Sequence, residues 1–387
     1  MRVRWAAGPV MLVLLLAGCS EDGGGSDPKA AAKPPAEVVI TPADGAGKVR
    51  PELPVKVEVA NGSLQNVSVS TGGSAVEGDL DALNGQWTAR RGLDPSTTYQ
   101  VTATALGQDG KDVSVTSEFT TLTPSRTIAV SAVAPAPKET VGVGMPIILN
   151  FDQPVYNQAD VEKNLTVKAS RPVEGAWRWI SRQQVVYRPK EYWPARTDVV
   201  VDARFSGVRA AKGVYGTKDL KLRFRIGDDQ RTLTNEDTHQ MVVKRNGRVL
   251  KRFPVSLGMA TTRAYTTTNG IHVTMEKVPH VLADSATVGI PKGHPDWYET
   301  PLDWTVRISS SGEYTHSAPW SVAQQGRSNV SHGCVNLSEA NAKWFYDFSR
   351  RGDIYEITGT DRELEWNNGW GYWQLSWKQW KKGSALD

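Results

Sequence analysis

Apolar and polar residues alternate with a period of two through much of the N-terminal half of the chain. Residues 55–59 and 113–115 show this alternation, and residues 61–63 and 72–74, which are rich in Gly, Asn and Ser, separate such stretches. Alternation places every second side chain on one face of a strand, and these small residues favour the turns between strands. Residues 38–124 are therefore predicted to form an antiparallel β-sandwich.

A second block, residues 125–226, repeats this pattern of short strands. Pro95 and Pro194 each precede the penultimate strand of their block. We therefore interpret the two blocks as tandem modules with the same fold. Tyr99, at the start of a strand in the first block, resembles the tyrosine corner of immunoglobulin-like folds. Two immunoglobulin-like β-sandwich modules are the expectation.

The strand pattern continues into a third block, residues 227–360. Asn246-Gly247 stands between two apolar runs and is a strong signal for a tight hairpin. One helix is legible, because Ser338 can cap its start and Gly352 lies just past its end. Its apolar face consists of Trp344, Phe345 and Phe348. The third block is expected to be a β-rich domain with one or two helices, so the whole chain is predicted to be mostly β.

The C-terminal segment, residues 361–387, is rich in tryptophan. Its regularly spaced tryptophans are Trp366, Trp370, Trp373, Trp377 and Trp380. Their spacing of four, three, four and three would place them along one helical face, although Gly369 and Gly371 argue against a continuous helix. A platform for a sugar or a membrane is one interpretation. We favour the other, in which the segment is a subdomain that packs its tryptophans onto the third block.

The N-terminus has the pattern of a secretory signal. Arg2 and Arg4 precede an apolar run at residues 9–17, which is too short to span a bilayer comfortably. The run leads into Leu-Ala-Gly-Cys, ending at Cys19, which resembles the bacterial lipobox. In a lipobox the peptidase cuts before the cysteine, and the thiol receives a diacylglyceryl group. Residues 1–18 are thus expected to be a lipoprotein signal peptide; the alternative is an ordinary signal peptide in which Cys19 is incidental.

Lipidation of Cys19 would determine where the protein resides. Each buried methylene contributes about 0.8 kcal/mol, so two or more acyl chains anchor a protein stably. Residues 19–37 contain Gly, Ser, Asp, Pro, Ala and Lys without apolar periodicity and are predicted to be a flexible linker. We expect the protein to be lipid-anchored to the cell membrane on its extracytoplasmic face, within the cell wall or periplasmic space.

Composition narrows the range of partners. Charged residues make up 22% of the 387 residues, and the formal net charge is +4. This balance does not favour a nucleic-acid partner. The chain has two cysteines, which exclude a disulfide framework unless they pair with each other, and lipidation of Cys19 would prevent that pairing. Cys334 is therefore considered as a single thiol.

Two histidines, His316 and His332, stand shortly before Cys334 in the sequence. A cysteine is a useful nucleophile as the thiolate, so it needs a base or a positive neighbour to lower its pKa, and imidazole is the usual partner. Gly333 removes a side chain where the backbone must approach a substrate, and successive amides in such a turn can point at an oxyanion. Nucleophile, base and electrophilic hole are thus available locally.

This stretch resembles the YkuD-type catalytic signature of L,D-transpeptidases, a His followed after about 14 to 17 residues by Ser/Thr-His-Gly-Cys-x-Asn. Here 14 residues separate His316 from Ser331, and the run from Ser331 to Asn336 matches every fixed position. The two modules before it and the tryptophan-rich tail after it are similar to actinobacterial members of that family. The chain departs from many members at residues 267–272, where it reads Thr-Thr-Asn-Gly-Ile-His instead of Thr-Pro-x-Gly-x-Phe.

Carried over residue by residue, the resemblance implies specific roles. Cys334 would be the acyl-forming nucleophile and His316 the general base, with Ser317 holding the His316 ring through its backbone or its hydroxyl. Amides around His332, Gly333 and Cys334 would build the oxyanion hole, and the Tyr298 hydroxyl would lie near the oxyanion. The substrate-binding residues implied by the resemblance are Tyr298, Trp320, Ser331 and Asn336.

The reaction implied is acyl transfer in peptidoglycan. Cys334 would attack the third residue of a donor tetrapeptide stem, release D-Ala and form a thioester, and the side-chain amine of a diamino acid on an acceptor stem would complete a 3-3 cross-link. Carbapenem-type β-lactams would acylate the same thiolate. No step needs a cofactor or a metal. Two alternative functions are consistent with the sequence. One is a carboxypeptidase or endopeptidase with water as acceptor, and the other is a non-catalytic cell-wall binding or spacer lipoprotein.

Other interpretations of the Cys-His motif are weaker. A zinc site from His316, His332 and Cys334 has suitable ligand types, but the spacing offers no fourth ligand. Papain-like peptidases usually place the cysteine before the histidine in the sequence, and here the order is reversed. A buried thiol beside a structural histidine would require the complete signature to be coincidental.

Overall fold

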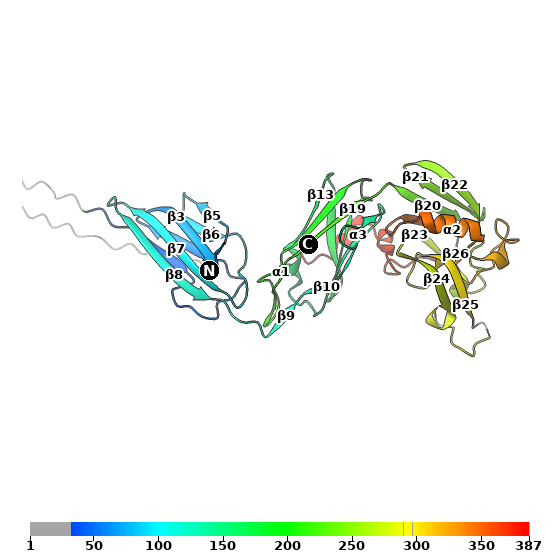
Figure 1. Cartoon of the computed structure of the whole chain (residues 1–387), viewed down its shortest axis with the longest axis horizontal. Helices are drawn as coiled ribbons and strands as arrows, with labels where there is room; N and C mark the ends of the chain where they lie inside the picture. Colours follow the sequence, from blue (N-terminus) through cyan, green and yellow to red (C-terminus); the bar gives the residue numbers. More distant parts are fainter. Residues whose placement is uncertain (1–31, 289, 296, 387) are drawn as a thin grey trace, which may run out of the picture.

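A computed structural model describes residues 32–386 except residues 289 and 296. The predicted signal peptide and Cys19 lie outside the described residues. Strands dominate the described chain, as the sequence predicts. In Figure 1 two β-sandwiches and a third β-rich unit follow one another along the long axis of the molecule. Among the residues described, every helix is too short or too polar to cross a bilayer.

The first sandwich packs two antiparallel sheets against each other. One sheet has the order β1-β2-β6-β5 and the other β4-β3-β7-β8. Their strands are β1 (Glu37–Thr41), β2 (Lys56–Ala60), β3 (Gly62–Thr71), β4 (Ser74–Ala75), β5 (Gly78–Asp81), β6 (Gln86–Ala89), β7 (Thr98–Gly107) and β8 (Asp112–Thr120). Along β7 buried and more exposed residues alternate, which is the pattern of a strand with one face on the core.

Tyr99 forms the predicted tyrosine corner. Its hydroxyl accepts a hydrogen bond of 2.7 Å from the backbone N–H of Asp94, and its ring stacks on Phe119 with 5.6 Å between centroids. Tyr99 is 2% exposed. The hydroxyl therefore satisfies a backbone donor at the corner while the ring fills the core of the sandwich.

The second sandwich has the sheets β10-β12-β15-β14 and β11-β19-β16-β13, and the short sheet β17-β18-β9 lies beside them. Its elements are β9 (Arg126–Ile128), β10 (Val130–Ala134), β11 (Thr140–Val141), β12 (Ile147–Phe151), α1 (Gln158–Glu162), β13 (Leu165–Ala169), β14 (Gly175–Ser181), β15 (Gln184–Pro189), β16 (Asp198–Ala203), β17 (Arg209–Ala211), β18 (Val214–Gly216) and β19 (Leu220–Ile226).

The predicted repeat is visible in the turns that precede β7 and β16. Thr97 donates its hydroxyl to the carbonyl of Pro95 at 2.9 Å, and Thr197 donates to the carbonyl of Pro194 at 2.6 Å. The following strands also correspond, because β7 pairs with β8 and β16 pairs with β19, both antiparallel. In each sandwich a threonine hydroxyl bonded to a preceding proline carbonyl thus introduces the corresponding strand, β7 or β16.

The third unit combines a six-stranded sheet, β22-β21-β20-β28-β23-β29, with a four-stranded sheet, β24-β25-β26-β27. Its strands are β20 (Gln230–Asn235), β21 (Gln240–Arg245), β22 (Arg248–Pro254), β23 (Thr268–Val273), β24 (Glu276–Asp284), β25 (Glu299–Arg307), β26 (Tyr314–Ser317), β27 (Val335–Leu337), β28 (Ile354–Thr358) and β29 (Arg362–Glu363), and its short 3-10 turns are η1 (Arg263–Tyr265), η2 (Ser285–Val288) and η3 (Pro319–Ser321). Asn246 and Gly247 both have positive φ and connect β21 to β22, so the predicted hairpin is confirmed.

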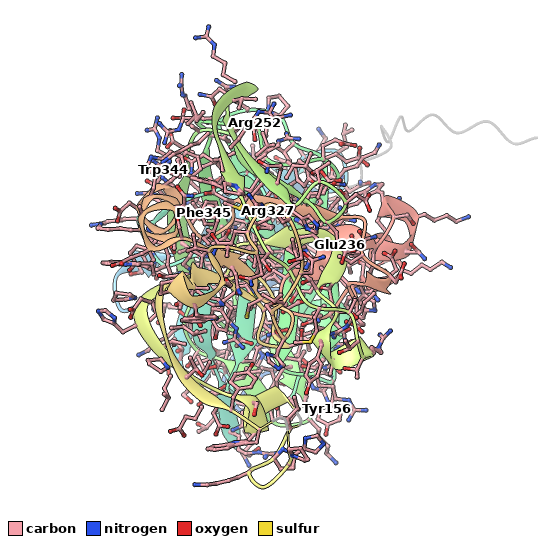
Figure 2. The ribbon with its side chains drawn as sticks, turned by 90° about the vertical axis from the view of Figure 1, so that its right-hand side faces the viewer. Tyr156, Glu236, Arg252, Arg327, Trp344 and Phe345 are labelled. Carbon is pink, nitrogen blue, oxygen red and sulfur yellow. The ribbon has the colours of Figure 1, made fainter. Side chains whose placement is uncertain are left out.

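The predicted helix is α2 (Glu339–Phe348), which begins directly after Ser338. Ser338 occupies the N-cap position, but its side chain makes no capping hydrogen bond. Phe345 is 2% exposed and fills the core, and the neighbouring Trp344 on the same ribbon lies towards the edge of the view in Figure 2. Trp344 stacks on Phe348 with 5.0 Å between centroids. The helix covers the four-stranded sheet that carries the Cys-His motif.

The tail forms η4 (Gly371–Gln374) and α3 (Trp377–Lys381), so it is not one continuous helix. It packs on the third unit, as expected, where η4 contacts β23, and also on the second sandwich, which the sequence did not predict. The indole N–H of Trp380 donates to the carbonyl of Ala176 in β14 at 2.9 Å, and that of Trp377 donates to Glu174 at 2.9 Å. In Figure 1 α3 accordingly lies beside the second sandwich.

Cations of the second sandwich explain this placement. The Arg188 guanidinium lies 4.6 Å from the ring of Trp373 and 5.0 Å from that of Trp380, and it donates to the carbonyl of Leu375 at 2.7 Å. Arg178 lies 4.9 Å from the ring of Trp366. Aromatic faces attract guanidinium groups, so the tail follows the arginines of β14 and β15. The tail also contacts the third unit, because η4 packs on β23.

Candidate active site

Two short parallel strands bring the motif residues together. His316 in β26 lies opposite Asn336 in β27. Residues opposite each other in a parallel pair share one face of the sheet, and so do residues two apart along a strand. Cys334 stands two residues before Asn336, and Tyr314 stands two before His316. Pairing and alternation therefore direct all four side chains to one face.

These side chains open into a cavity of about 490 Å³. Of the motif and substrate residues predicted from the sequence, it is lined by Tyr298, His316, Trp320, Ser331, His332, Cys334 and Asn336. Ser317 and Gly333 do not line it, and Ser317 follows His316 directly in β26, so the alternation of a strand directs its side chain to the other face. Most of the residues predicted for the site therefore line a single cavity.

His316 is held in one tautomer by its neighbour. It is 3% exposed, and its Nδ1 lies 2.8 Å from the backbone carbonyl oxygen of Ser317. Because a carbonyl oxygen only accepts, Nδ1 must carry the proton, and Nε2 of the neutral ring is left as a base. Burial lowers the pKa of His316 to about 4, opposed by the hydrogen bond to Ser317. The backbone of Ser317, and not its hydroxyl, orients the ring.

Cys334 is a protonated thiol in this arrangement. Burial raises its pKa to about 12, while a hydrogen bond from the Tyr314 backbone acts in the opposite direction. Its Sγ lies 3.6 Å from the carbonyl oxygen of Gly312, to which the S–H donates. The expectation that a neighbouring base lowers the thiol pKa is therefore not met by the free site. A neutral thiol and the neutral imidazole of His316 share the cavity instead.

Ser331 and Gly333 build the turn before the thiol. The Ser331 hydroxyl donates to the carbonyl of Cys334 at 2.6 Å and accepts from the Gly333 N–H at 3.1 Å. Gly333 has φ +120, a conformation that favours glycine. Its amide is thus engaged within the turn, which differs from the expectation that it faces an oxyanion. Ser331 shapes the nucleophile loop, and the expectation stays open for the amides of His332 and Cys334.

Aromatic rings surround the mouth of the cavity. The rings of Tyr265 and Tyr298 lie 4.6 Å and 5.0 Å from that of His332, centroid to centroid. Burial raises the pKa of Tyr298 to about 12, so its hydroxyl stays protonated and can donate. Trp320 is 60% exposed, and its ring lies 6.1 Å from that of His316. These rings offer apolar surface to a substrate beside a phenolic donor.

Asn336 anchors the floor of the site. Its Nδ2 donates to the Ser321 hydroxyl at 3.1 Å, and its backbone N–H donates to the Ser256 carbonyl at 2.9 Å. The side chain is buried and joins β27 to η3, next to Trp320. No group of three or more His, Cys, Asp or Glu side chains suited to a metal occurs among the described residues, so the alternative zinc site finds no geometric support there.

Three residues that contact the nucleophile loop were not singled out from the sequence. Gly312 and Tyr314 touch Cys334 through their backbones, and the Thr267 hydroxyl donates to the carbonyl of Gly333 at 2.9 Å. Backbone contacts carry no residue-type signal, so only the pairing of β26 with β27 could have revealed the first two. Thr267 lies in the stretch where the chain departs from the family signature.

Comparisons with known proteins agree with this architecture. The family described as bacterial Ig domain matches residues 46–209, and the family described as L,D-transpeptidase catalytic domain matches residues 229–357. A catalytic domain of this kind behind immunoglobulin-like sandwiches defines the class of protein. L,D-transpeptidase 2 of Mycobacterium tuberculosis strain CDC 1551 / Oshkosh is 37% identical over 344 residues, which are 88% of this chain and 83% of that protein. The chain belongs to the L,D-transpeptidase family.

Another relative and solved structures give the same picture. L,D-transpeptidase 5 of Mycobacterium tuberculosis H37Rv is 37% identical over 91% of this chain and 78% of its own length. The structure of LD transpeptidase LdtMt1 in complex with imipenem is 36% identical, covers 59% of this chain and 99% of that one, and has a TM-score of 0.52. An L,D-transpeptidase from Mycobacterium smegmatis is 33% identical, covers 60% and 99%, and has a TM-score of 0.50.

Proposed function

We propose that this family member forms 3-3 cross-links in peptidoglycan through a thioester on Cys334. The observation that supports the proposal best is the shared cavity of Cys334 and His316, in which the Nδ1–H of His316 is bound to Ser317 and Nε2 is left as a base. A neutral imidazole can take the proton of a neutral thiol as the sulfur attacks, so no preformed thiolate is needed.

In the first half-reaction the Cys334 sulfur attacks the carbonyl carbon of the third stem residue, and His316 Nε2 takes the thiol proton. The oxyanion would be met by the Tyr298 hydroxyl and by amides of the nucleophile loop. When the tetrahedral intermediate collapses, the bond to the D-Ala nitrogen breaks, and His316 returns its proton to that amine. A thioester and free D-Ala result.

In the second half-reaction the side-chain amine of a diamino acid on an acceptor stem attacks the thioester. His316 takes a proton from the amine, the carbon–sulfur bond breaks, and the proton passes to the departing Cys334 sulfur. The exposed Trp320 lies beside His316 and gives the acceptor stem a surface close to the base. The enzyme returns to the neutral pair from which it began.

The same chemistry supports inhibition by β-lactams. One relative has been solved in complex with imipenem, and L,D-transpeptidase 3 of Mycobacterium tuberculosis has been solved with a faropenem-derived adduct. We propose that carbapenems acylate Cys334 of this chain. Attack of the Cys334 sulfur on the lactam carbonyl would break the ring C–N bond and form a thioester, with the amine, protonated by His316, still tethered to the acyl group.

We further propose that the protein is a lipoprotein, anchored through Cys19 on the extracytoplasmic face of the membrane. The sequence before Cys19 supports this proposal, and residues 19–37 would act as the tether. Replacing Cys19 with alanine should move the protein from the membrane fraction to the soluble fraction. A Cys19→Ala protein that stays in the membrane fraction would rule out the thioether anchor.

Product analysis by mass spectrometry tests the reaction. Purified protein is incubated with disaccharide-tetrapeptide, with and without an added diamino-acid amine. A dimer lighter than two donors by one D-Ala is expected, and tripeptide alone would indicate the carboxypeptidase instead. His316→Ala should lose about a hundredfold or more in rate. Ser317→Ala is the matched control, because it keeps the backbone carbonyl that orients the ring and should retain most of the activity.

A further inference from the structure

A cluster of three buried polar side chains lies behind the candidate active site. Glu313 is 4% exposed, and Thr268 and His272 are fully buried. The Thr268 N–H donates to one carboxylate oxygen of Glu313 at 2.6 Å, and the Thr268 Oγ1 lies 2.7 Å from the other. The same Oγ1 lies 2.7 Å from His272 Nε2, and His272 Nδ1 lies 3.0 Å from the carbonyl oxygen of Gly270.

The protons in this cluster can be counted from its hydrogen bonds. The Gly270 carbonyl only accepts, so His272 Nδ1 carries a proton. The Thr268 hydroxyl has one proton and bridges two atoms, Glu313 Oε2 and His272 Nε2, which without protons would both be acceptors. One further proton must therefore reside on Glu313 or on His272 Nε2. In either arrangement the pair carries no net charge, which suits its burial.

Glu313 is placed between the two backbone groups that touch the nucleophile. The carbonyl of Gly312, just before it, accepts from the Cys334 thiol at 3.6 Å. The backbone of Tyr314, just after it, makes a hydrogen bond to the same sulfur. The Glu313 side chain is bound to Thr268 through both of its carboxylate oxygens. Any shift of Glu313 therefore moves both contacts of Cys334 together.

The other end of the cluster also reaches the nucleophile loop. Thr267, next to Thr268, donates its hydroxyl to the carbonyl of Gly333 at 2.9 Å and accepts from the Gly258 N–H at 2.9 Å. Thr267 and Thr268 are adjacent at the start of β23, so the strand fixes the loop and the segment of Glu313 at once. Cys334 is thus held by the segment around Glu313, which contacts its sulfur, and by Thr267, which binds the preceding residue Gly333.

We propose that Glu313, Thr268 and His272 are positioning residues, which act as one uncharged hydrogen-bonded unit to hold Gly312 and Tyr314 against the Cys334 thiol. The inference rests on the proposed role of Cys334 as nucleophile. A core that only needed stability could be filled with apolar side chains here, since buried polar groups of this kind are often replaced without loss. The polar unit instead fixes a backbone segment whose exact placement governs a reacting atom.

The test compares Thr268→Val with Thr268→Ser in the full-length protein. Valine keeps the shape and removes the hydroxyl, whereas serine keeps the hydroxyl. The readout is the rate of Cys334 alkylation by iodoacetamide, followed by peptide mass spectrometry, which resolves Cys334 from Cys19. Thr268→Val should slow alkylation about tenfold or more, and Thr268→Ser should stay within about threefold of wild type. A Thr268→Val protein that melts as wild type and is alkylated at the wild-type rate would overturn the proposal.

Two further variants complete the test. Glu313→Gln can accept from the Thr268 N–H and donate to its hydroxyl, so it should also stay within about threefold of wild type. If Cys334 of Glu313→Gln is alkylated as slowly as that of Thr268→Val, the proposal that the hydrogen-bonded unit is uncharged is wrong. If Thr268→Val does not fold, His272→Phe takes its place with the same expected loss, because it removes the ring nitrogens that lie against Thr268 and Gly270. Alkylation measures the reactivity of the Cys334 thiol and needs no peptidoglycan substrate. The positioning role can therefore be tested even if the proposed cross-linking reaction is wrong.

Discussion

The two β-sandwiches share a fold and a characteristic turn, but they differ in how their cores are built. The first has a core of its own, around Tyr99 and Phe119. The core of the second continues into the third unit and the tail, because Ile354, Trp370 and Trp380 belong to the same apolar cluster. The first sandwich is therefore an appended module, whereas the second is part of the body that carries the active site.

The contacts at the two junctions differ accordingly. Between the first and second sandwiches Arg91 pairs with Asp219 at 3.8 Å and Arg209 with Glu52 at 3.9 Å, and such partly exposed pairs contribute little. Backbones pack closely at both junctions, since an added Cβ would lie 2.1 Å from the Leu93 carbonyl oxygen at Gly207 and 2.2 Å from the Asp353 nitrogen at Gly142. What distinguishes the second junction is the apolar cluster that crosses it and includes both Val143 and Ile354. Among the described residues, the two sandwiches thus have separate apolar clusters, whereas the second sandwich and the third unit share one.

Deletions should give the largest difference between the two sandwiches. A protein without residues 38–124 should fold and keep the turnover of the full chain in solution, because those residues pack among themselves. A protein without residues 38–226 should not fold, because Ile354 and Trp380 lose most of their apolar partners. Thermal unfolding shows whether each deletion protein folds, and a cross-linking assay measures its turnover. A folded, active protein lacking both sandwiches would refute the shared core and make each sandwich a mere spacer.

Truncating a tail tryptophan should have the next largest effect. Trp380 is fully buried, so Trp380→Ala should lower the free energy of unfolding of the shared body by about 3–5 kcal/mol. Calorimetry should show the transition of the first sandwich unchanged and that of the second sandwich and third unit lowered together. Trp377→Ala, at a more exposed position of α3, is the matched control with a smaller loss. Two separately shifted transitions for the second sandwich and the third unit would contradict the single body.

A smaller effect is expected in how the free energy of unfolding depends on pH, and it arises from Asp353. Burial raises the pKa of Asp353 in the folded protein to about 7, against a reference of 3.8. Because the folded pKa is the higher one, this stabilising contribution is complete below 3.8 and is lost as the pH rises through 7. Wild type should lose about 1.4 kcal/mol per pH unit relative to Asp353→Asn within that window. Equal slopes for the two proteins would show that Asp353 is not held protonated.

The smallest expected effect is confined to the first sandwich. Tyr99→Phe removes the hydroxyl that accepts from the Asp94 N–H and should cost about 1 kcal/mol. Calorimetry should show this loss in the transition of the first sandwich, with cross-linking activity unchanged. A lowered activity or a lowered transition of the shared body would mean that the two sandwiches are coupled.

Local signals in the sequence were enough for the elements and for the motif. Tyr99, the Asn246-Gly247 turn and the apolar face of α2 each act through neighbours within a few residues, so their patterns survive in the sequence. His316 and Cys334 were recognisable because their spacing reflects the pairing of β26 with β27.

Contacts between distant residues could not be predicted in the same way. The additional packing of the tail on the second sandwich was not predicted, because its tryptophans contact Arg178 and Arg188, which stand nearly two hundred residues earlier. The cluster around Glu313 joins β23 to the residue just before β26 through hydrogen bonds between Glu313 and Thr268, which stand 45 residues apart. The high pKa of Cys334 likewise arises from burial, which residue types near the motif do not reveal.

The proposed thioester can be tested directly by mass spectrometry of the acyl-enzyme. Full-length protein is mixed with disaccharide-tetrapeptide, quenched in acid and digested, and the peptide that contains Cys334 is weighed. This peptide should gain the mass of the donor less its terminal D-Ala, whereas Cys334→Ala should gain nothing and form no cross-links. Cross-linked product from Cys334→Ala, or an acyl group on another residue, would contradict the account.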